Sequence, residues 1–248
     1  MRIAVAQTRP FKGDILQNIE AHIQFIGLAG AERADTIVFP ELSVTGYEPE
    51  LAAGLAMTAA DVRLDIFQTL SDRYSMTIGV GVPTTVGAGV RITELIFQPG
   101  QLRQAYSKRY LHADEQPYFV CGAEAGLLRD GKIALAICYE VSVPAHSEQA
   151  HRGGAEIYLV SVAKTKAGMD GAAETLAGIA RRYSMTVLVS NCVGHCADFE
   201  CGGRSAVWSR EGVMLAQLDG IEEGILVLDT DTGVVIRKEL NSIAYEGQ

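Results

Sequence analysis

Residues 133–140 read IALAICYE, an apolar strand that runs directly into Cys138. Residues from about 141 to 152 follow with a helical pattern, so Cys138 is predicted to lie on a strand-to-helix turn. The positive end of a helix lowers the pKa of a nearby thiol, and its first N–H groups can hydrogen-bond an oxyanion. Cys138 is therefore a candidate nucleophile, although a cysteine in this setting is also commonly an inert core residue.

Strands and helices alternate on both sides of this stretch. Helices are expected from Asp14 onward and at about 58–74, 141–152 and 170–184. Strands are expected near 2–7, 36–39, 76–82, 90–97, 101–107, 126–129, 132–137, 156–161, 186–190, 204–209, 213–217 and 224–229. This order predicts an α/β fold with two packed sheets and helices outside, a four-layer α-β-β-α sandwich. No linker divides the chain, so we expect one domain over residues 1–248 with a polar C-terminal tail at about 230–248.

An internal repeat points to two related halves. The sequence RYSMT at residues 73–77 recurs at residues 182–186. Each copy is expected to end a helix and begin a strand. A similar helix-to-strand passage lies upstream of each copy, at residues 34–38 and 155–159. The chain is therefore expected to contain two copies of one α/β unit.

Two further predicted strands end in a charged residue. Glu41 follows an apolar strand and Pro40, and Lys108 follows the strand near 101–107. In open α/β sheets, strand ends and their loops form the ligand crevice. Either charge alone is commonly a solvated loop residue. Their combination with a cysteine at a third strand end indicates an active site.

The segments around these residues are FPELSVTGY (39–47), AYSKRYLHADEQPYF (105–119) and ALAICYE (134–140). Together they resemble the nitrilase superfamily of carbon–nitrogen hydrolases, and the likeness extends from the first strand to GRSAVWSREGV (203–213). The resemblance implies a catalytic triad of Glu41, Lys108 and Cys138, with a second active-site glutamate at Glu115. It also implies a homodimer or a larger homo-oligomer.

The chemistry of these side chains fits amide hydrolysis. In water a carboxylate with a pKa of about 4.3 is a weak base for a thiol with a pKa of about 8.5, but burial and a nearby lysine can bring the two closer. We expect Glu41 to take the Cys138 proton before the sulfur attacks the carbonyl carbon. Lys108 and the backbone N–H of Tyr139 would stabilise the oxyanion. Glu115 would orient Lys108 or the leaving group, water activated by Glu41 would release the acid, and no metal or organic cofactor is needed.

The expected substrate is a small-molecule amide or carbamoyl amine. Cysteine followed by tyrosine is similar to amidases in this family, whereas cysteine followed by tryptophan is similar to nitrilases, so Tyr139 favours an amide over a nitrile. Tyr139 and Tyr47 are the candidate substrate-binding residues, although Tyr47 fits a packing role equally well. Two segments depart from the family pattern: residues 143–145 (VPA) lack the glutamate of the common Phe-Pro-Glu word, and residues 160–164 (VSVAK) replace Asn-Pro-Ser-Ala beside the pocket. Because these segments differ from those of the family, the resemblance does not identify the substrate.

Other functions remain as alternatives. The same thioester could pass its acyl group to an amine, which would make the protein an acyltransferase. A non-catalytic binding protein on this fold would have no reason to keep all three triad residues. A papain-like Cys–His enzyme would need one of the histidines near Cys138, and none of them lies in a recognisable motif.

Composition excludes several classes. The net charge is −9 and no Lys/Arg run forms a basic face, so we expect no nucleic-acid partner. No apolar run approaches the roughly 20 residues that span a bilayer, and the N-terminus does not have the pattern of a signal peptide. The five cysteines lack disulfide-scaffold spacing, which favours the reducing cytoplasm. Cys192, His195, Cys196 and Cys201 lie close in sequence without a second distant pair, so no metal site is expected.

Overall fold

The computed structural model describes residues 1–129 and 131–240. The described strands form two large sheets and one hairpin. The first sheet has the order β15 (Val235–Glu239), β14 (Gly224–Asp229), β1 (Arg2–Gln7), β2 (Thr36–Val38), β3 (Thr77–Val86), β4 (Gly89–Phe97) and β5 (Gln104–Ser107). The second has the order β13 (Met214–Gln217), β12 (Ala206–Trp208), β9 (Thr186–Ser190), β8 (Ile157–Ser161), β7 (Ile133–Ile137) and β6 (Leu127–Leu128). The hairpin pairs β10 (Val193–Cys196) with β11 (Phe199–Gly202).

Each large sheet has a parallel centre. Strands β1, β2 and β3 are parallel in the first sheet, as are β7, β8 and β9 in the second. Strand β5 is antiparallel to β4, which is antiparallel to β3, so β5 runs in the same direction as β2. The ends of β2 and β5 therefore lie at the same edge of the sheet, and they carry Glu41 and Lys108 to that edge.

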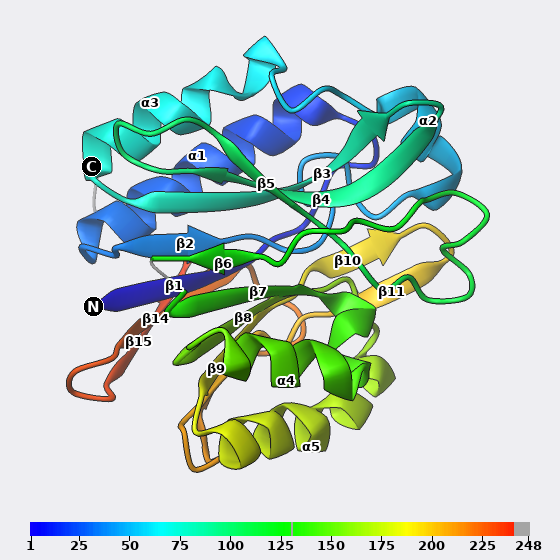
Figure 1. Ribbon diagram of the computed structural model, residues 1–248. Coiled ribbons are helices and arrows are strands. Elements are labelled where there is room, and N and C mark those ends of the chain that lie inside the picture. The colour runs from blue at the N-terminus through cyan, green and yellow to red at the C-terminus, as the bar shows by residue number, and fades with distance from the viewer. Residues whose placement is uncertain (130, 241–248) are drawn as a thin grey trace.

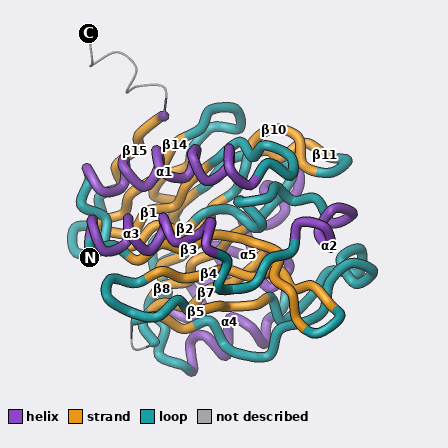
Figure 2. The backbone as a smooth tube through the Cα atoms, turned by 90° about the horizontal axis from the view of Figure 1, so that it is seen from above, coloured by secondary structure: helices purple, strands orange, loops and turns teal. Residues whose placement is uncertain are grey.

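The helices lie on the outer faces of the two sheets (Figure 1). On the first sheet these are α1 (Ile15–Ala31) and α3 (Asp65–Tyr74), which lie side by side in Figure 2, and on the second they are α4 (Pro144–Arg152) and α5 (Lys166–Tyr183). Shorter helical segments are η1 (Pro49–Leu51), α2 (Ala52–Leu55), η2 (Val62–Leu64) and η3 (Cys138–Ser142). No helix in the described part of the chain is long and apolar enough to cross a membrane.

Three buried apolar clusters fill the spaces between the layers. One joins α1 and α3 to the first sheet, and it includes Phe25 and Phe67. A second lies between the two sheets, with Val5 of β1 and Leu135 of β7 among its members. A third joins α4 and α5 to the second sheet. The predicted four-layer α-β-β-α sandwich is confirmed.

The two RYSMT segments adopt the same conformation in the two halves. Ser75 and Ser184 end α3 and α5 with φ angles of 51° and 52°, in the left-handed region. The next strand then begins at a threonine whose N–H donates to the residue before the neighbouring parallel strand. Thr77 donates to the Asp35 carbonyl and Thr186 to the Glu156 carbonyl, both at 2.9 Å. The sequence repeat therefore corresponds to a structural repeat, as predicted.

Two expectations from the sequence were wrong in detail, and one hairpin was missed. The polar tail expected from about residue 230 contains an edge strand, β15, which pairs with β14. Its residues Val235–Glu239 are mostly polar or half-exposed because an edge strand has water on one side, so its apolar signal is weak. Residues 241–248 lie outside the described part. Helix α3 begins at Asp65 rather than near residue 58, and the hairpin β10–β11 was not expected.

Candidate active site

Cys138 lies where β7 ends and the helical turn η3 begins. The strand is buried throughout, and it pairs in parallel with β8, which fixes its end in the second sheet. Cys138 has a φ of 45°, a left-handed conformation that residues with a Cβ adopt rarely. Its side chain remains partly accessible. The predicted strand-to-helix turn is present, but it is a 3-10 turn that precedes α4 rather than the start of one long helix.

Glu41 lies in a tight turn that packs against β3. Its neighbour Leu42 has a φ of 52°, and the Val44 N–H donates to the Gly81 carbonyl at 3.0 Å. A Cβ at Gly81 would lie 2.4 Å from the Leu42 backbone nitrogen, so this close approach requires glycine. The turn buries the Glu41 side chain completely.

The Lys108 side chain is also completely buried, between two carboxylates. Its Nζ lies 2.7 Å from Oε1 of Glu41 and 2.5 Å from Oε1 of Glu115. Burial lowers the pKa of Lys108, but the negative charges of Glu41 and Glu115 and the hydrogen bond to Glu115 outweigh it and hold the pKa above its ordinary value. An unpaired ammonium at this depth would cost several kcal/mol, so the two carboxylates are what keep the lysine charged.

Glu115 is fixed by donors on both of its oxygens. Oε1 accepts from Lys108 and from the Tyr47 hydroxyl at 3.1 Å, and Oε2 accepts from the His112 backbone N–H at 2.8 Å. Tyr47, expected to bind substrate, is thus also a structural partner of the buried cluster. It lines a cleft together with Tyr118 and other residues of this region, which are Lys12, Glu48, Pro49, Glu50, Leu51, Asp114, Ala197, Asp198 and Phe199.

The protonation of Glu41 and Cys138 depends on their burial. Burial raises the pKa of Glu41 to about 7, although Lys108 lowers it. Burial also raises the pKa of the Cys138 thiol to about 12, and the charge of Glu41 adds to that, whereas Lys108 and Lys164 lower it. The nearby Cys138 thiol also lowers the pKa of Glu41 slightly, and Glu41 Oε2 is buried without a hydrogen-bond partner among the described residues, so this oxygen is available to accept a proton. Glu41 is therefore a stronger base than an exposed carboxylate, placed beside the thiol.

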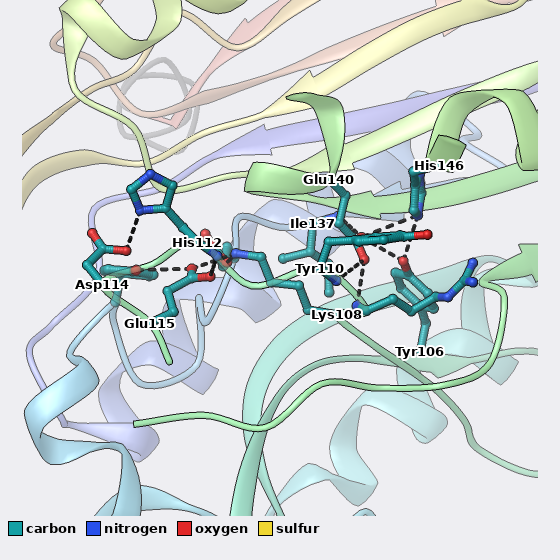
Figure 3. A network of polar contacts seen from close by, with 12 residues as sticks. Tyr106, Lys108, Tyr110, His112, Asp114, Glu115, Ile137, Glu140 and His146 are labelled. Carbon is teal, nitrogen blue, oxygen red and sulfur yellow. Dashed lines mark hydrogen bonds and ion pairs between the residues drawn. The ribbon is translucent and has the colours of Figure 1, made fainter. Parts of the chain in front are cut away.

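Glu140 is a buried carboxylate of the site that the sequence analysis did not identify. Its Oε2 accepts a hydrogen bond from the Ile137 N–H at 2.8 Å (Figure 3). Its Oε1 accepts one from the Arg109 N–H at 2.6 Å. Ile137 precedes Cys138, and Arg109 follows Lys108. One side chain thus joins the strand ends that carry the cysteine and the lysine. A carboxylate two residues after the nucleophile was visible in the sequence, but its burial was not.

Tyrosines and a histidine complete the surroundings of Glu140. The Tyr106 hydroxyl donates to Glu140 Oε2 at 2.6 Å and also contacts Nε2 of His146 at 2.8 Å (Figure 3). Nδ1 of His146 contacts the Tyr158 hydroxyl at 2.7 Å. Both ring nitrogens of His146 are therefore occupied away from Cys138, which argues against a papain-like pair with this histidine.

Tyr139 follows Cys138 directly in the chain, and the charge of Lys164 acts on the Cys138 thiol. The Tyr139 ring is half-buried and meets the His112 ring edge-on, with centroids 5.1 Å apart. Its N–H belongs to the first turn of η3, where backbone donors have no partner within the helix. Lys164 follows β8, in the segment that departs from the family pattern, and its charge lowers the pKa of Cys138. It is the second site residue that the sequence analysis did not identify.

Comparison with known proteins identifies the family. The chain matches the family model for carbon-nitrogen hydrolase over residues 2–237, and it belongs to this family. It is 28% identical over 207 residues to the 2-oxoglutaramate amidase of Bacillus subtilis (strain 168), covering 81% of this chain and 80% of that protein. It is 27% identical over 256 residues to a glutamine-dependent NAD(+) synthetase of Aquifex aeolicus (strain VF5), covering 99% of this chain and 45% of that protein. The chain thus spans less than half the length of this synthetase.

Solved structures show the same fold. A mutant of the amidase from Nesterenkonia sp. AN1, with acrylamide added at its active-site cysteine, superposes with a TM-score of 0.83 at 23% identity, over 92% of each chain. A variant of that amidase in complex with butyramide gives a TM-score of 0.85 at 23% identity, over 94% of this chain and 92% of that one.

Proposed function

We propose that this protein hydrolyses the C–N bond of a small amide through a thioester on Cys138. The proposal depends on one arrangement, in which Lys108 Nζ lies 2.7 Å from Glu41 and 2.5 Å from Glu115, and the charges of Glu41 and Lys108 act on the partly accessible Cys138. Buried charges of this kind are costly and cluster at functional sites. Membership of the carbon–nitrogen hydrolase family and the amidases among its relatives support the same reaction.

In the first half-reaction the Cys138 thiol loses its proton to Glu41 as Sγ forms a bond to the amide carbon. The oxyanion that develops is held by the Lys108 ammonium and the Tyr139 N–H, and donors of this kind contribute on the order of 3 kcal/mol each. Glu41 then gives the proton to the nitrogen, the C–N bond breaks, and ammonia or an amine leaves. The acyl group remains on Cys138 as a thioester.

In the second half-reaction water replaces the amine. Glu41 takes a proton from the water as its oxygen attacks the thioester, and the acid leaves when the C–S bond breaks. The proton returns to Cys138, so the enzyme regains its starting state. Glu115 and Tyr47 act by holding Lys108 in place throughout. No step needs an oxidant, a reductant or a bound cofactor.

We further propose that the substrate is an ω-amide with a carboxylate at its other end. Two names among the relatives, 2-oxoglutaramate amidase and glutamine-dependent NAD(+) synthetase, refer to compounds of this type. Lys164 supplies a cationic side chain whose charge lowers the pKa of Cys138. It belongs to residues 160–164, which differ from the segment that is common beside the pocket in this family. A substrate carboxylate next to this ammonium would form a charge-assisted hydrogen bond.

The test is mass spectrometry of the intact protein after exposure to a panel of amides. A mass adduct is expected on the wild type and on Cys121→Ala, a matched control for an exposed thiol, but not on Cys138→Ala. The mass of the adduct also names the acyl group. No acylation of Cys138 by any amide would refute the proposal. Product analysis with and without an added amine then distinguishes hydrolysis from acyl transfer, because only a transferase gives a new amide.

We also propose that the chain is one domain that works in the cytoplasm as a homodimer or larger homo-oligomer. Its second apolar cluster draws on both sheets, which supports a single domain. Size-exclusion chromatography with light scattering tests the assembly. A monomer at micromolar concentration would refute it.

A further inference from the structure

Three buried cysteines come together at the hairpin β10–β11. Sγ of Cys192 lies 3.0 Å from Sγ of Cys201 and 3.6 Å from Sγ of Cys196, and all three sulfurs lie within 4.8 Å of one another. The side chains are 2%, 1% and 2% exposed for Cys192, Cys196 and Cys201. The three thiols therefore form a compact triangle with almost no contact with water.

The register of the hairpin explains the triangle. Gly194 pairs with Cys201 across the two strands, and Cys192 and Cys196 lie two residues to either side of Gly194. Successive residues of a strand point to opposite faces, so these two cysteines and the position of Gly194 share a face. Because Gly194 has no side chain, it places no atom between the two flanking cysteines, and the position of its absent Cβ is approached by the Arg9 side chain.

We propose that Cys192, Cys196 and Cys201 bind a thiophilic metal ion, such as Zn²⁺ or Cu⁺, through three sulfur ligands. A metal–sulfur bond of about 2.3 Å places the sulfurs of such a site about 3.8–4.0 Å apart. The three sulfurs need only small rotations to reach that spacing. Thiolates are soft ligands that select these ions over Mg²⁺ or Ca²⁺. On binding, each thiol releases its proton to solvent, so the site gives up three protons for one ion.

The surroundings of the three sulfurs include one cationic side chain and a mostly apolar wall. A cationic side chain is close by, since a Cβ at Gly194 would lie 2.6 Å from Arg9 Nη1. The rest of the wall is apolar or aromatic, with Ala163, Tyr47 and Phe199 packed on the cluster.

Three converging sulfurs also argue against a simple disulfide. A disulfide would join two cysteines, most directly Cys192 and Cys201, and it would need an oxidant to accept two electrons and two protons. The third sulfur would have no role. A metal ion uses all three and needs no redox step. A disulfide is the alternative outcome that the experiment separates.

The site also touches the catalytic cluster. Tyr47 packs against the three cysteines, while its hydroxyl donates to Glu115, the partner of Lys108. Because Cys138 lies in this neighbouring cluster and could itself bind a thiophilic ion, metal binding must be measured in a variant that lacks the Cys138 thiol. A double variant, Cys121→Ser with Cys138→Ser, removes the two cysteines outside the triangle and leaves the three proposed ligands.

The experiment titrates this reduced double variant with Cd²⁺ without oxygen and follows the ultraviolet absorption of thiolate-to-metal charge transfer. Saturation at one equivalent is expected, with displacement by Zn²⁺, no effect of Mg²⁺ and a rise in melting temperature. Adding Cys196→Ser should weaken binding at least tenfold. Because replacing a buried cysteine also lowers the stability of the fold, X-ray absorption of the Zn²⁺-loaded wild-type chain gives a second measurement, with more than one sulfur per zinc expected.

Three results would overturn the proposal. The first is no charge-transfer absorption at stoichiometric Cd²⁺ in the folded double variant. The second is binding that Cys196→Ser leaves unchanged. The third is a Cys192–Cys201 disulfide, found by intact mass after mild peroxide treatment, in a protein whose reduced form takes up no Cd²⁺. That last result would make the cluster an oxidation site instead.

Discussion

Replacement of Glu140 by glutamine tests whether one buried carboxylate positions both the nucleophile and the lysine. Each Glu140 oxygen accepts from a backbone N–H, Ile137 on Oε2 at 2.8 Å and Arg109 on Oε1 at 2.6 Å. Glutamine is nearly the same size but replaces one oxygen with an NH₂ group. Whichever way the amide turns, one backbone N–H faces another donor.

The cost can be worked out from these contacts. Losing a hydrogen bond to a charged acceptor and leaving a buried donor unsatisfied costs about 3 kcal/mol. In a domain of this size that corresponds to a fall in melting temperature of roughly 6–12 °C. The segments that carry Cys138 and Lys108 are no longer joined, and a misplacement of about 1 Å lowers turnover on the order of 100-fold. Glu140 is thus expected to be a positioning residue.

The assay compares Glu140→Gln with Glu140→Asp and with the exposed control Glu124→Gln. For Glu140→Gln, kcat should fall with little change in KM, and alkylation of Cys138 by iodoacetamide should show an altered pH profile. Glu140→Asp keeps the negative charge and should restore part of kcat and part of the alkylation profile. Glu124→Gln should match the wild type in both measurements. A lower melting temperature with unchanged kcat and an unchanged alkylation profile would refute the positioning role and leave a structural one.

Three more predictions concern the reaction itself. Glu41→Gln should lower kcat by about 10²–10⁴-fold with the fold retained by circular dichroism, and unchanged turnover would remove Glu41 as the base. In the wild type kcat/KM should rise as pH increases through about 7, the pKa of Glu41, because the base must be ionised to accept a proton; a flat profile across that range would contradict this. Lys164→Met should lower kcat/KM roughly 10- to 100-fold for an ω-amide with a carboxylate but not for butyramide, and an equal loss on both would refute carboxylate recognition.

Much of the layout could be predicted because its signals are local. The apolar run before Cys138, the RYSMT repeat and the charged residues after two strands are all visible in short segments. Parallel strands bring their ends to one edge, which is why Glu41 and Lys108 could be expected to meet. The edge strand β15 and the hairpin β10–β11 were missed because each of these strands is only four or five residues long and mixes apolar with polar residues or glycine, so only pairing with a neighbour makes them strands.

The amino-acid sequence by itself determined the layers of the fold and the strand ends at which a thiol, a carboxylate and an ammonium lie, since hydrophobic periodicity and backbone preferences act over a few residues. Only the tertiary structure decided that Glu140 is buried across two such ends and that three cysteines of one hairpin meet in a triangle. Burial and hydrogen bonding depend on segments far apart in the chain, and they set the pKa values of Glu41 and Cys138. The same residue types on an exposed loop would have ordinary acidities.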